Sequence, residues 1–411
     1  MGSDLDKRMS VFGPHVFDGV PLMRSAAAAG VPLRTAQRWL EPPAGRVPRC
    51  AGFRERTREM NRTMARLAVC SATALAMVMI PAAAGATTAQ AVRPTQAAGP
   101  SMQYQQRQLG FDAIVNDVND VGVVVGESAG HAFSWNATTK RKTDLGTLGG
   151  YNSVAYGIND SGQIVGTSDV AGVRHAFLWK PRDRRMTDLG TLGGDYSTAF
   201  AINNLGVVVG ESDTAGGVSH PFRWDPRTRH MTDLGTLGGD SSTATAINDR
   251  GQIVGYARTS EFLAHAFLWD PHSKCMQDLG LLPNSVVSFA TGINIRGEVV
   301  GYTNDVGDFT DRAFRWDPQT RKMSTIPGVP DVYSHATGIN DVGQIAGYWD
   351  DQSGRTTPFV WNPVRRTPTV LPQSSTEPFS FYTTTSAINN RSWVAGDESS
   401  AVLWIPQRER S

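Results

Sequence analysis

The chain has 411 residues, with 39 basic and 38 acidic side chains and a formal charge of +1. That near-neutral total hides unlike parts, because residues 1–66 carry 12 Lys and Arg against 6 Asp and Glu, residues 67–91 carry no charge, and the remainder is net acidic. With 40% hydrophobic residues the chain can bury a core, which excludes wholesale disorder. The acidic remainder gives no electrostatic reason to expect nucleic-acid binding there.

The first residues contain a short pattern of two helices. Residues 22–40, LMRSAAAAGVPLRTAQRWL, predict a helix, a turn at Gly30 and a second helix. This stretch resembles the helix-turn-helix of integrase-type transposases, whose second helix enters the major groove of DNA. The resemblance implies DNA contacts by Arg34, Thr35, Gln37 and Arg38. It ends at Pro42, and the catalytic part of that family is absent, so we interpret residues 1–59 as a non-native or mis-annotated leader.

Residues 60–91 have the layout of a signal peptide. Five arginines precede an uncharged run from Leu67 to Ala86, and translation would begin at Met60 or Met64. Small residues then offer cleavage after Ala86 or Ala91. We therefore expect a secreted protein, with signal peptide about 64–91 and a linker at 92–101. The alternative is a membrane anchor formed by an uncleaved 67–86 segment, which is just long enough to span a bilayer.

The rest of the chain repeats itself about every 45 residues, which indicates a repeat architecture. A glycine follows an apolar pair once in each of seven copies, and so does a tryptophan further on. The tryptophans are Trp135, Trp179, Trp224, Trp269, Trp316, Trp361 and Trp404. The glycines are Gly126, Gly166, Gly210, Gly255, Gly301, Gly347 and Gly396. The asparagines that we align with them are Asn116, Asn159, Asn203, Asn248, Asn294, Asn340 and Asn389.

Each copy predicts four short antiparallel strands. In residues 197–239 the runs STAFAIN, VVVGES, HPFRW and HMTDL are rich in β-branched or aromatic residues and are separated by Asn, Asp, Gly and Pro. An Asn-x-x-Gly junction supplies the turn between the first two strands. Small residues in the first strand, such as Ala199 and Ala201, suit a crowded centre.

Four strands in 40 to 50 residues are typical of a β-propeller blade, so we predict an all-β, seven-bladed β-propeller over residues 102–411. The last copy ends before its fourth strand, whereas residues 103–110 precede the first copy. We expect this N-terminal strand to complete the C-terminal blade and to close the ring. Only Cys275 lies in this part, so we expect neither a disulfide framework nor a cysteine metal site within it.

The recurring HAF and DLGTLGG blocks, as in His131-Ala132-Phe133, resemble the HAF-repeat family of extracellular proteins over residues 102–406. That resemblance implies export, a propeller-like repeat and no established activity. Later copies depart from the family, since Arg312, Thr357 and Ser400 replace the histidine. The histidine is therefore not needed to fold every blade.

Repeated side chains have structural interpretations. His131, His175, His220 and His265 would lie a blade apart, too far to share a metal ion, and we expect them to cap or pack the third strand. The repeated tryptophans should pack between sheets. Trp349 and Trp393 lie outside the repeated position and are candidates for ligand binding. The asparagine set is expected near one mouth of the channel, either as turn caps or as a ligand site.

Acidic loops supply the other candidates for ligand binding. They are Asp305, Asp308, Asp311, Asp350 and Asp351. Their spacing does not match a calcium loop. The sequence contains no G-x-S-x-G, Walker or H-E-x-x-H motif, so we predict no catalytic residues, no metal and no cofactor.

We therefore predict a secreted, non-catalytic and monomeric binding module for an unknown extracellular protein or glycan, with no nucleic acid bound by the mature protein. Its contact surfaces would be the variable loops between the second and third strands, because loops on a rigid scaffold carry function. These loops are 169–173, 213–219, 258–263, 304–311 and 350–356. One alternative is an exported hydrolase acting on a polysaccharide. The other is a membrane-anchored regulator with a cytoplasmic DNA-binding head.

Overall fold

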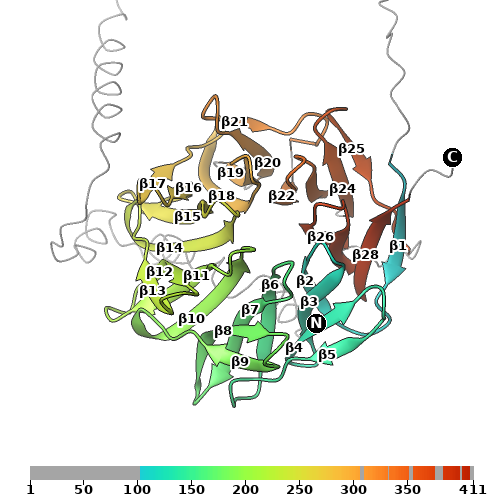
Figure 1. The fold of residues 1–411 in the computed structure, drawn as a ribbon. Helices are drawn as coiled ribbons and strands as arrows, with labels where there is room; N and C mark the ends of the chain where they lie inside the picture. Colours follow the sequence, from blue (N-terminus) through green and yellow to red (C-terminus); the bar gives the residue numbers. More distant parts are fainter. Residues whose placement is uncertain are drawn as a thin grey trace, which may run out of the picture. The chain divides into compact units, whose positions relative to one another are not determined.

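The computed structural model describes residues 102–305, 310–331, 333–350, 355–374, 383–398 and 400–407. Within these residues every helix or strand assigned is a β-strand (Figure 1). No helix in this described part is long and apolar enough to cross a membrane. The predicted leader at 1–59, the signal peptide at 60–91 and the linker at 92–101 lie outside the described residues.

The strands form sheets arranged around a central axis, and in the described residues five sheets have four strands and one has eight (Figure 1). The first sheet holds β2 (Ile114–Val118), β3 (Val123–Ser128), β4 (His131–Asn136) and β5 (Lys142–Asp144). The eight-stranded sheet holds β6 (Ser153–Ile158), β7 (Ile164–Val170), β8 (Val173–Lys180), β9 (Arg185–Asp188), β10 (Gly193–Ile202), β11 (Val208–Thr214), β12 (Ser219–Asp225) and β13 (His230–Asp233).

The next sheet holds β14 (Gly238–Ile247), β15 (Ile253–Thr259), β16 (Ala264–Asp270) and β17 (Cys275–Asp278). It is followed by β18 (Ser285–Ile293), β19 (Val299–Asp305), β20 (Asp311–Asp317) and β21 (Lys322–Thr325). Then come β22 (Ser334–Ile339), β23 (Ile345–Asp350), β24 (Thr356–Asn362) and β25 (Thr367–Val370). The last sheet joins β26 (Thr383–Ile388), β27 (Val394–Glu398) and β28 (Ser400–Pro406) to β1 (Tyr104–Gln108). The fold is an all-β propeller with four-stranded blades.

The predicted closure of the ring is confirmed. Strand β1 pairs antiparallel with β28, from Tyr104 opposite Pro406 to Gln108 opposite Val402, so the two ends of the repeat region lie side by side (Figure 1). Leu109 N–H extends the pairing by donating to the carbonyl of Ala401 at 3.0 Å. Because β1 supplies the missing outer strand, the last blade is completed by the other end of the repeat region.

The recurring glycine of the second strand faces a carbonyl of the first strand. At Gly210 an added Cβ would lie 1.9 Å from the carbonyl oxygen of Thr198, because the first strand is irregular between Ala199 and Ala201. The small residues of the first strand also meet a neighbour, since a Cβ on Gly157 would lie 2.9 Å from the carbonyl of Phe200. Close approach of backbones therefore explains both patterns of small residues.

The repeated tryptophans are buried, as predicted, with exposed fractions from 0% at Trp404 to 8% at Trp179 and Trp269. They lie in apolar clusters that join adjacent blades. One cluster, for example, packs Val165 and Leu178 against Phe222 and Trp224. Cys275 is disulfide-bonded.

The two ends of the ring differ in their connections, because the strands of each blade are antiparallel. One end, which we call the turn face, carries the turns from first to second strands, such as 203–206, and from third to fourth strands, such as 226–229. The opposite end, the loop face, carries the loops from second to third strands and the connections between blades. The described residues of the five variable loops therefore belong to the loop face, whereas residues 306–309 and 351–354 lie outside the described part of the chain.

Candidate functional site: the polar mouth of the channel

The mouth of the channel on the turn face is built from the Asn-x-x-Gly turns. In the turn after β10, the side-chain oxygen of Asn203 accepts from the N–H groups of Leu205 at 3.1 Å and Val207 at 2.9 Å. Gly206 has φ +77°, the left-handed conformation that the turn requires. The asparagine thus fixes its own turn, as the capping interpretation predicts.

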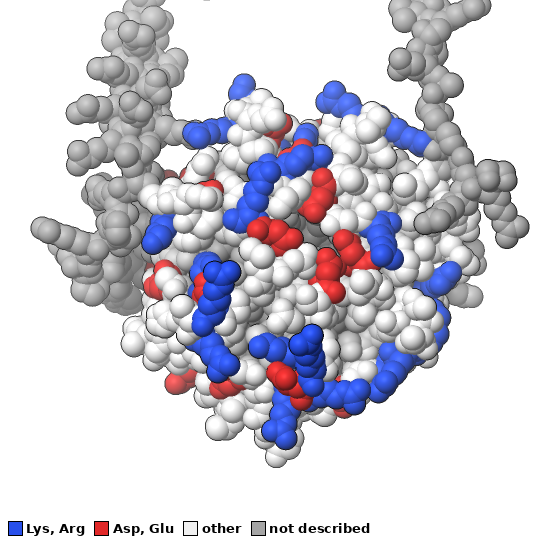
Figure 2. Space-filling model, viewed as in Figure 1, with Lys and Arg blue, Asp and Glu red and all other residues white. Residues whose placement is uncertain are grey.

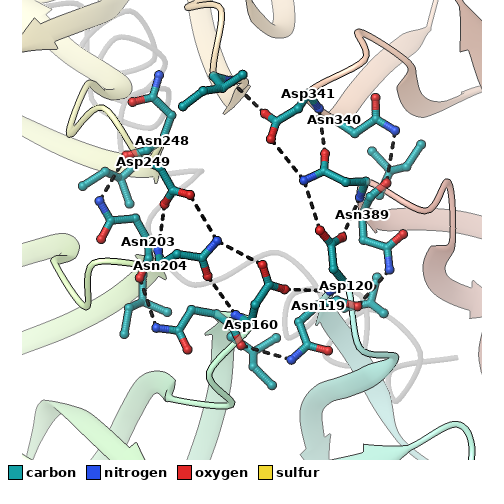
Figure 3. A pocket seen from close by; sticks show the side chains of 18 of the residues that line it. Asn119, Asp120, Asp160, Asn203, Asn204, Asn248, Asp249, Asn340, Asp341 and Asn389 are labelled. Atoms are coloured by element: carbon teal, nitrogen blue, oxygen red, sulfur yellow. Dashed lines mark hydrogen bonds between the residues drawn. The ribbon is translucent and has the colours of Figure 1, made fainter.

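The amide nitrogens of these asparagines link each blade to the next. Asn203 Nδ2 donates to the carbonyl of Asn248 at 3.1 Å, and the pattern continues around the channel. Asn389 completes it by donating to the carbonyl of Asn119 at 2.8 Å. We call this set the asparagine circle. Its members are Asn119, Asn159, Asn203, Asn248, Asn294, Asn340 and Asn389 (Figure 3).

One member of the predicted set is wrong, because Asn116 is not in the circle. Asn116 lies three residues earlier in β2, and its Nδ2 donates to the carbonyl of Ala155 at 2.8 Å. Thr245 has the corresponding role in a later blade, where its hydroxyl donates to Ala290 O at 2.7 Å. Asn119 begins the Asn-x-x-Gly turn that ends at Gly122. Alignment of the repeats by even spacing therefore assigned Asn116 to the set, whereas the turn motif identifies Asn119.

A second circle lies at the residues that follow the asparagines. Its members are Asp120, Asp160, Asn204, Asp249, Ile295, Asp341 and Asn390. The Nδ2 of Asn204 donates to Asp160 at 3.0 Å and to Asp249 at 3.1 Å, and Asn390 bridges Asp120 and Asp341 in the same way (Figure 3). Ile295 has no polar side chain, so the circle is interrupted there. Sequence reasoning missed this set, although each member is adjacent to the repeated asparagine.

The mouth encloses a hollow of about 210 Å³, which the two circles line together with aliphatic side chains from the ends of the first strands. Figure 2 shows acidic side chains gathered around this central hollow. The aliphatic members are Val118, Ile158, Ile202, Ile247, Ile293, Ile339 and Ile388. Four carboxylates at one opening favour a cationic over an anionic group. Within the described residues, no group of three His, Cys, Asp or Glu side chains is placed to hold a metal ion.

Two carboxyl groups near the first blade are perturbed by burial. Burial raises the pKa of Asp117 to about 6, although the N–H groups of Ile158 and Val118 each donate to it at 2.9 and 2.8 Å. Burial also raises the pKa of Asp397 to about 7, against a 3.3 Å hydrogen bond from Val115 N–H. Asp397 thus contacts β2 from β27, at the junction of the last blade with the first.

The four repeated histidines tie the third strand to the fourth. His220 Nδ1 lies 2.8 Å from Asp233, and the other three lie 2.8–3.0 Å from the aspartate thirteen residues later. Burial acts to raise the pKa of Asp233, but the hydrogen bonds from His220 and Gly235 hold it below its ordinary value. This geometry agrees with the predicted structural role.

Three of the predicted acidic loop residues, Asp305, Asp311 and Asp350, lie in the described part of the chain. Asp305 accepts from Ser285 at 2.7 Å and Arg312 at 2.6 Å, whereas Asp311 accepts from Asn304 and contacts His335 Nε2 at 2.9 Å. A carboxylate oxygen of Asp350 is buried without a hydrogen-bond partner. Asp308 and Asp351 lie outside the described residues.

The two tryptophans proposed as binding residues are half-buried. Trp349 stacks on Phe359 with ring centroids 5.1 Å apart. Trp393 packs against the first blade, where an added Cβ on Gly122 would lie 2.6 Å from its ring. Both side chains therefore contribute to packing, and their role in binding stays a prediction.

Comparison with known proteins adds the fold alone. No family model matches the chain, and no curated protein does. It is similar to TolB from Acinetobacter baumannii, with 16% identity over 52% of this chain and 53% of that one, at a TM-score of 0.41. It is also similar to the extracellular domain of a two component system from B. thetaiotaomicron, with 13% identity over 76% of this chain and 40% of that one, at a TM-score of 0.51.

Oligogalacturonate lyase from Vibrio parahaemolyticus aligns at 10% identity over 74% of this chain and 97% of its own, with a TM-score of 0.47. The chain spans about half or less of the first matched structures. The chain is a β-propeller. Propellers serve many functions, so the likeness carries no activity to this chain.

Proposed function

We propose that the protein is an exported, non-catalytic binding module of the HAF-repeat type, whose loop face recognises an extracellular protein or glycan. The observation that carries the proposal is the placement of the variable loops. The strand ends that the five loops join lie on one face of the scaffold, and hydrogen bonds link its blades around the axis. Loops of differing sequence on a rigid frame are where binding specificity concentrates.

We further infer that the ring has seven blades. The eight-stranded sheet is joined in the middle by a single pair, Tyr196 with Arg174, and divides there into two groups of four strands. The asparagine circle has seven members, one directly after each first strand. Both observations support counting the eight-stranded sheet as two adjacent blades.

The binding proposal is tested on residues 92–411, which contain every strand contact described above. The fragment is applied to a glycan array and to isolated cell walls, and bound proteins are identified after pull-down. We expect one class of ligand to be retained, and substitutions in the loops at 213–219 and 258–263 to abolish retention. Substitutions in the outer turn at 226–229 are the matched control. The proposal would be overturned if the fragment retained no ligand, or if only the control substitutions abolished retention.

Export is tested separately by sequencing the N-terminus of the protein from culture medium. The proposal expects a start near Thr87 or Val92. A membrane-bound product that keeps residues 67–86 would instead support the anchored alternative.

A further inference from the structure

The two faces of the propeller carry opposite charge. Every turn that joins a third to a fourth strand in the described residues has at least one exposed Lys or Arg, as at Arg182 and Arg227, and the exposed Lys322 directly follows such a turn. Three of the turns from first to second strands also carry a basic residue, namely Arg250, Arg296 and Arg391. Figure 2 shows Lys and Arg side chains spread over one face of the molecule, around its acidic centre.

The loop face is acidic instead. The fourth strands end there in aspartates such as Asp144, Asp188 and Asp233, and the first residues of β10 and β14 add Asp195 and Asp240. Its basic residues in the described part include the partly buried Arg174, Arg258 and Arg312, the exposed Arg355, and Lys142, whose Nζ donates to Ser128 at the end of β3. The net acidic charge of the domain is therefore an average over two unlike faces.

The acidic residues of the turn face are held in specific positions. The mouth aspartates share the amide donors of Asn204 and Asn390 around the central hollow. Asp225 accepts from the N–H of Arg227 in its own turn at 2.9 Å, and Asp270 and Asp317 occupy the same position in later turns. Asp183 is the exposed acid of the outer turns, and it lies among arginines. The outer part of this face is thus predominantly basic.

Exposed aliphatic side chains occupy tips of the same turns. Val121, Leu205 and Val342, at the third position of their Asn-x-x-Gly turns, are 51%, 66% and 55% exposed. Val364, in an outer turn beside Arg365 and Arg366, is 89% exposed. A soluble polyanion would use the basic side chains but would gain little from aliphatic tips. An anionic lipid surface uses both, because cations attract its headgroups and apolar side chains enter the headgroup boundary.

We propose that the turn face docks on an anionic lipid bilayer, with the basic turns against the headgroups and the aliphatic tips among them. The loop face is then directed away from the membrane. Peripheral attachment of this kind needs no spanning segment and is independent of what the loop face binds.

The test is co-sedimentation of residues 92–411 with vesicles of phosphatidylcholine, alone or with about a third phosphatidylglycerol, at low and high salt. We expect binding to the anionic vesicles only, weakened by salt because the attraction is screened. The triple variant Arg182→Glu, Arg227→Glu and Lys322→Glu should lose about tenfold or more in affinity. The matched control carries the same charge change on the loop face, Arg174→Glu, Arg258→Glu and Arg355→Glu, and should bind at least as well as the wild type.

The aliphatic tips are tested by Val121→Ser, Leu205→Ser and Val364→Ser together, with Val173→Ser and Val218→Ser on the loop face as control. We expect several-fold weaker vesicle binding for the first set only, while circular dichroism shows both sets folded. Soluble polyphosphate is the comparison ligand. The proposal would be overturned if the protein bound neutral vesicles as well as anionic ones, or if the loop-face variants lost as much vesicle binding as the turn-face variants. It would also be overturned if the protein bound polyphosphate tightly while the aliphatic substitutions left vesicle binding unchanged. The glycan and cell-wall assays of the loop face are scored separately, so either proposal can fail alone.

Discussion

Replacing Asn203 with alanine measures what the asparagine circle contributes to stability. The side chain is 4% exposed and takes part in three hydrogen bonds, to Leu205 N–H, Val207 N–H and the carbonyl of Asn248. A hydrogen bond contributes about 1 kcal/mol net, and a buried group left unpaired costs about 1–3 kcal/mol. Because Val207 and Asn248 are buried, we expect Asn203→Ala to lower the free energy of unfolding by about 3 kcal/mol.

The adjacent residue supplies the control. Asn204 also takes part in three hydrogen bonds in the circle, but it is exposed, and water can replace its partners. Asn204→Ala should therefore cost about 1 kcal/mol or less. Both variants are compared with the wild type by urea denaturation, followed by tryptophan fluorescence and circular dichroism. Equal losses in the two variants would refute the argument that burial of the circle stabilises the ring.

Three further predictions concern the stability of the propeller. Gly301→Ala should prevent stable folding, because its Cβ would lie 1.9 Å from the carbonyl oxygen of Phe289. Gly216→Ala is the control and should have little effect on the melting temperature, because its Cβ would lie 3.7 Å from the nearest neighbouring atom. Burial raises the pKa of Asp397 from its ordinary value of 3.8 to about 7, so ionisation of this carboxyl destabilises the fold as pH rises from about 4 to 7, and the stability stays lower above pH 7. Relative to Asp397→Asn, the wild type should therefore melt lower at pH 8 than at pH 5, and parallel melting curves would contradict this. Deleting residues 102–109 should open the ring and lower the unfolding midpoint, whereas deleting residues 92–101 should not.

Much of the fold could be predicted because its determinants are local. Asn-x-x-Gly turns, β-branched runs and Asp-Pro ends mark the strands within each repeat, and the missing last strand predicted the pairing of β1 with β28. The glycines of the second strands were visible as a pattern as well. The reason for these glycines could not be predicted, because the carbonyl that excludes a Cβ belongs to a first strand whose irregularity is apparent only in the tertiary structure.

The sequence by itself determined the repeat, the strand class, the pairing of the ends and the burial of the tryptophans, because each depends on residue type and spacing along one chain. Only the tertiary structure decided that Asn119, and not Asn116, belongs to the circle, since its partners are Asn159 and Asn389 in the neighbouring blades. It also decided the separation of charge. Acidic and basic residues are mixed along the sequence of the repeats, and the antiparallel strands place them on opposite faces.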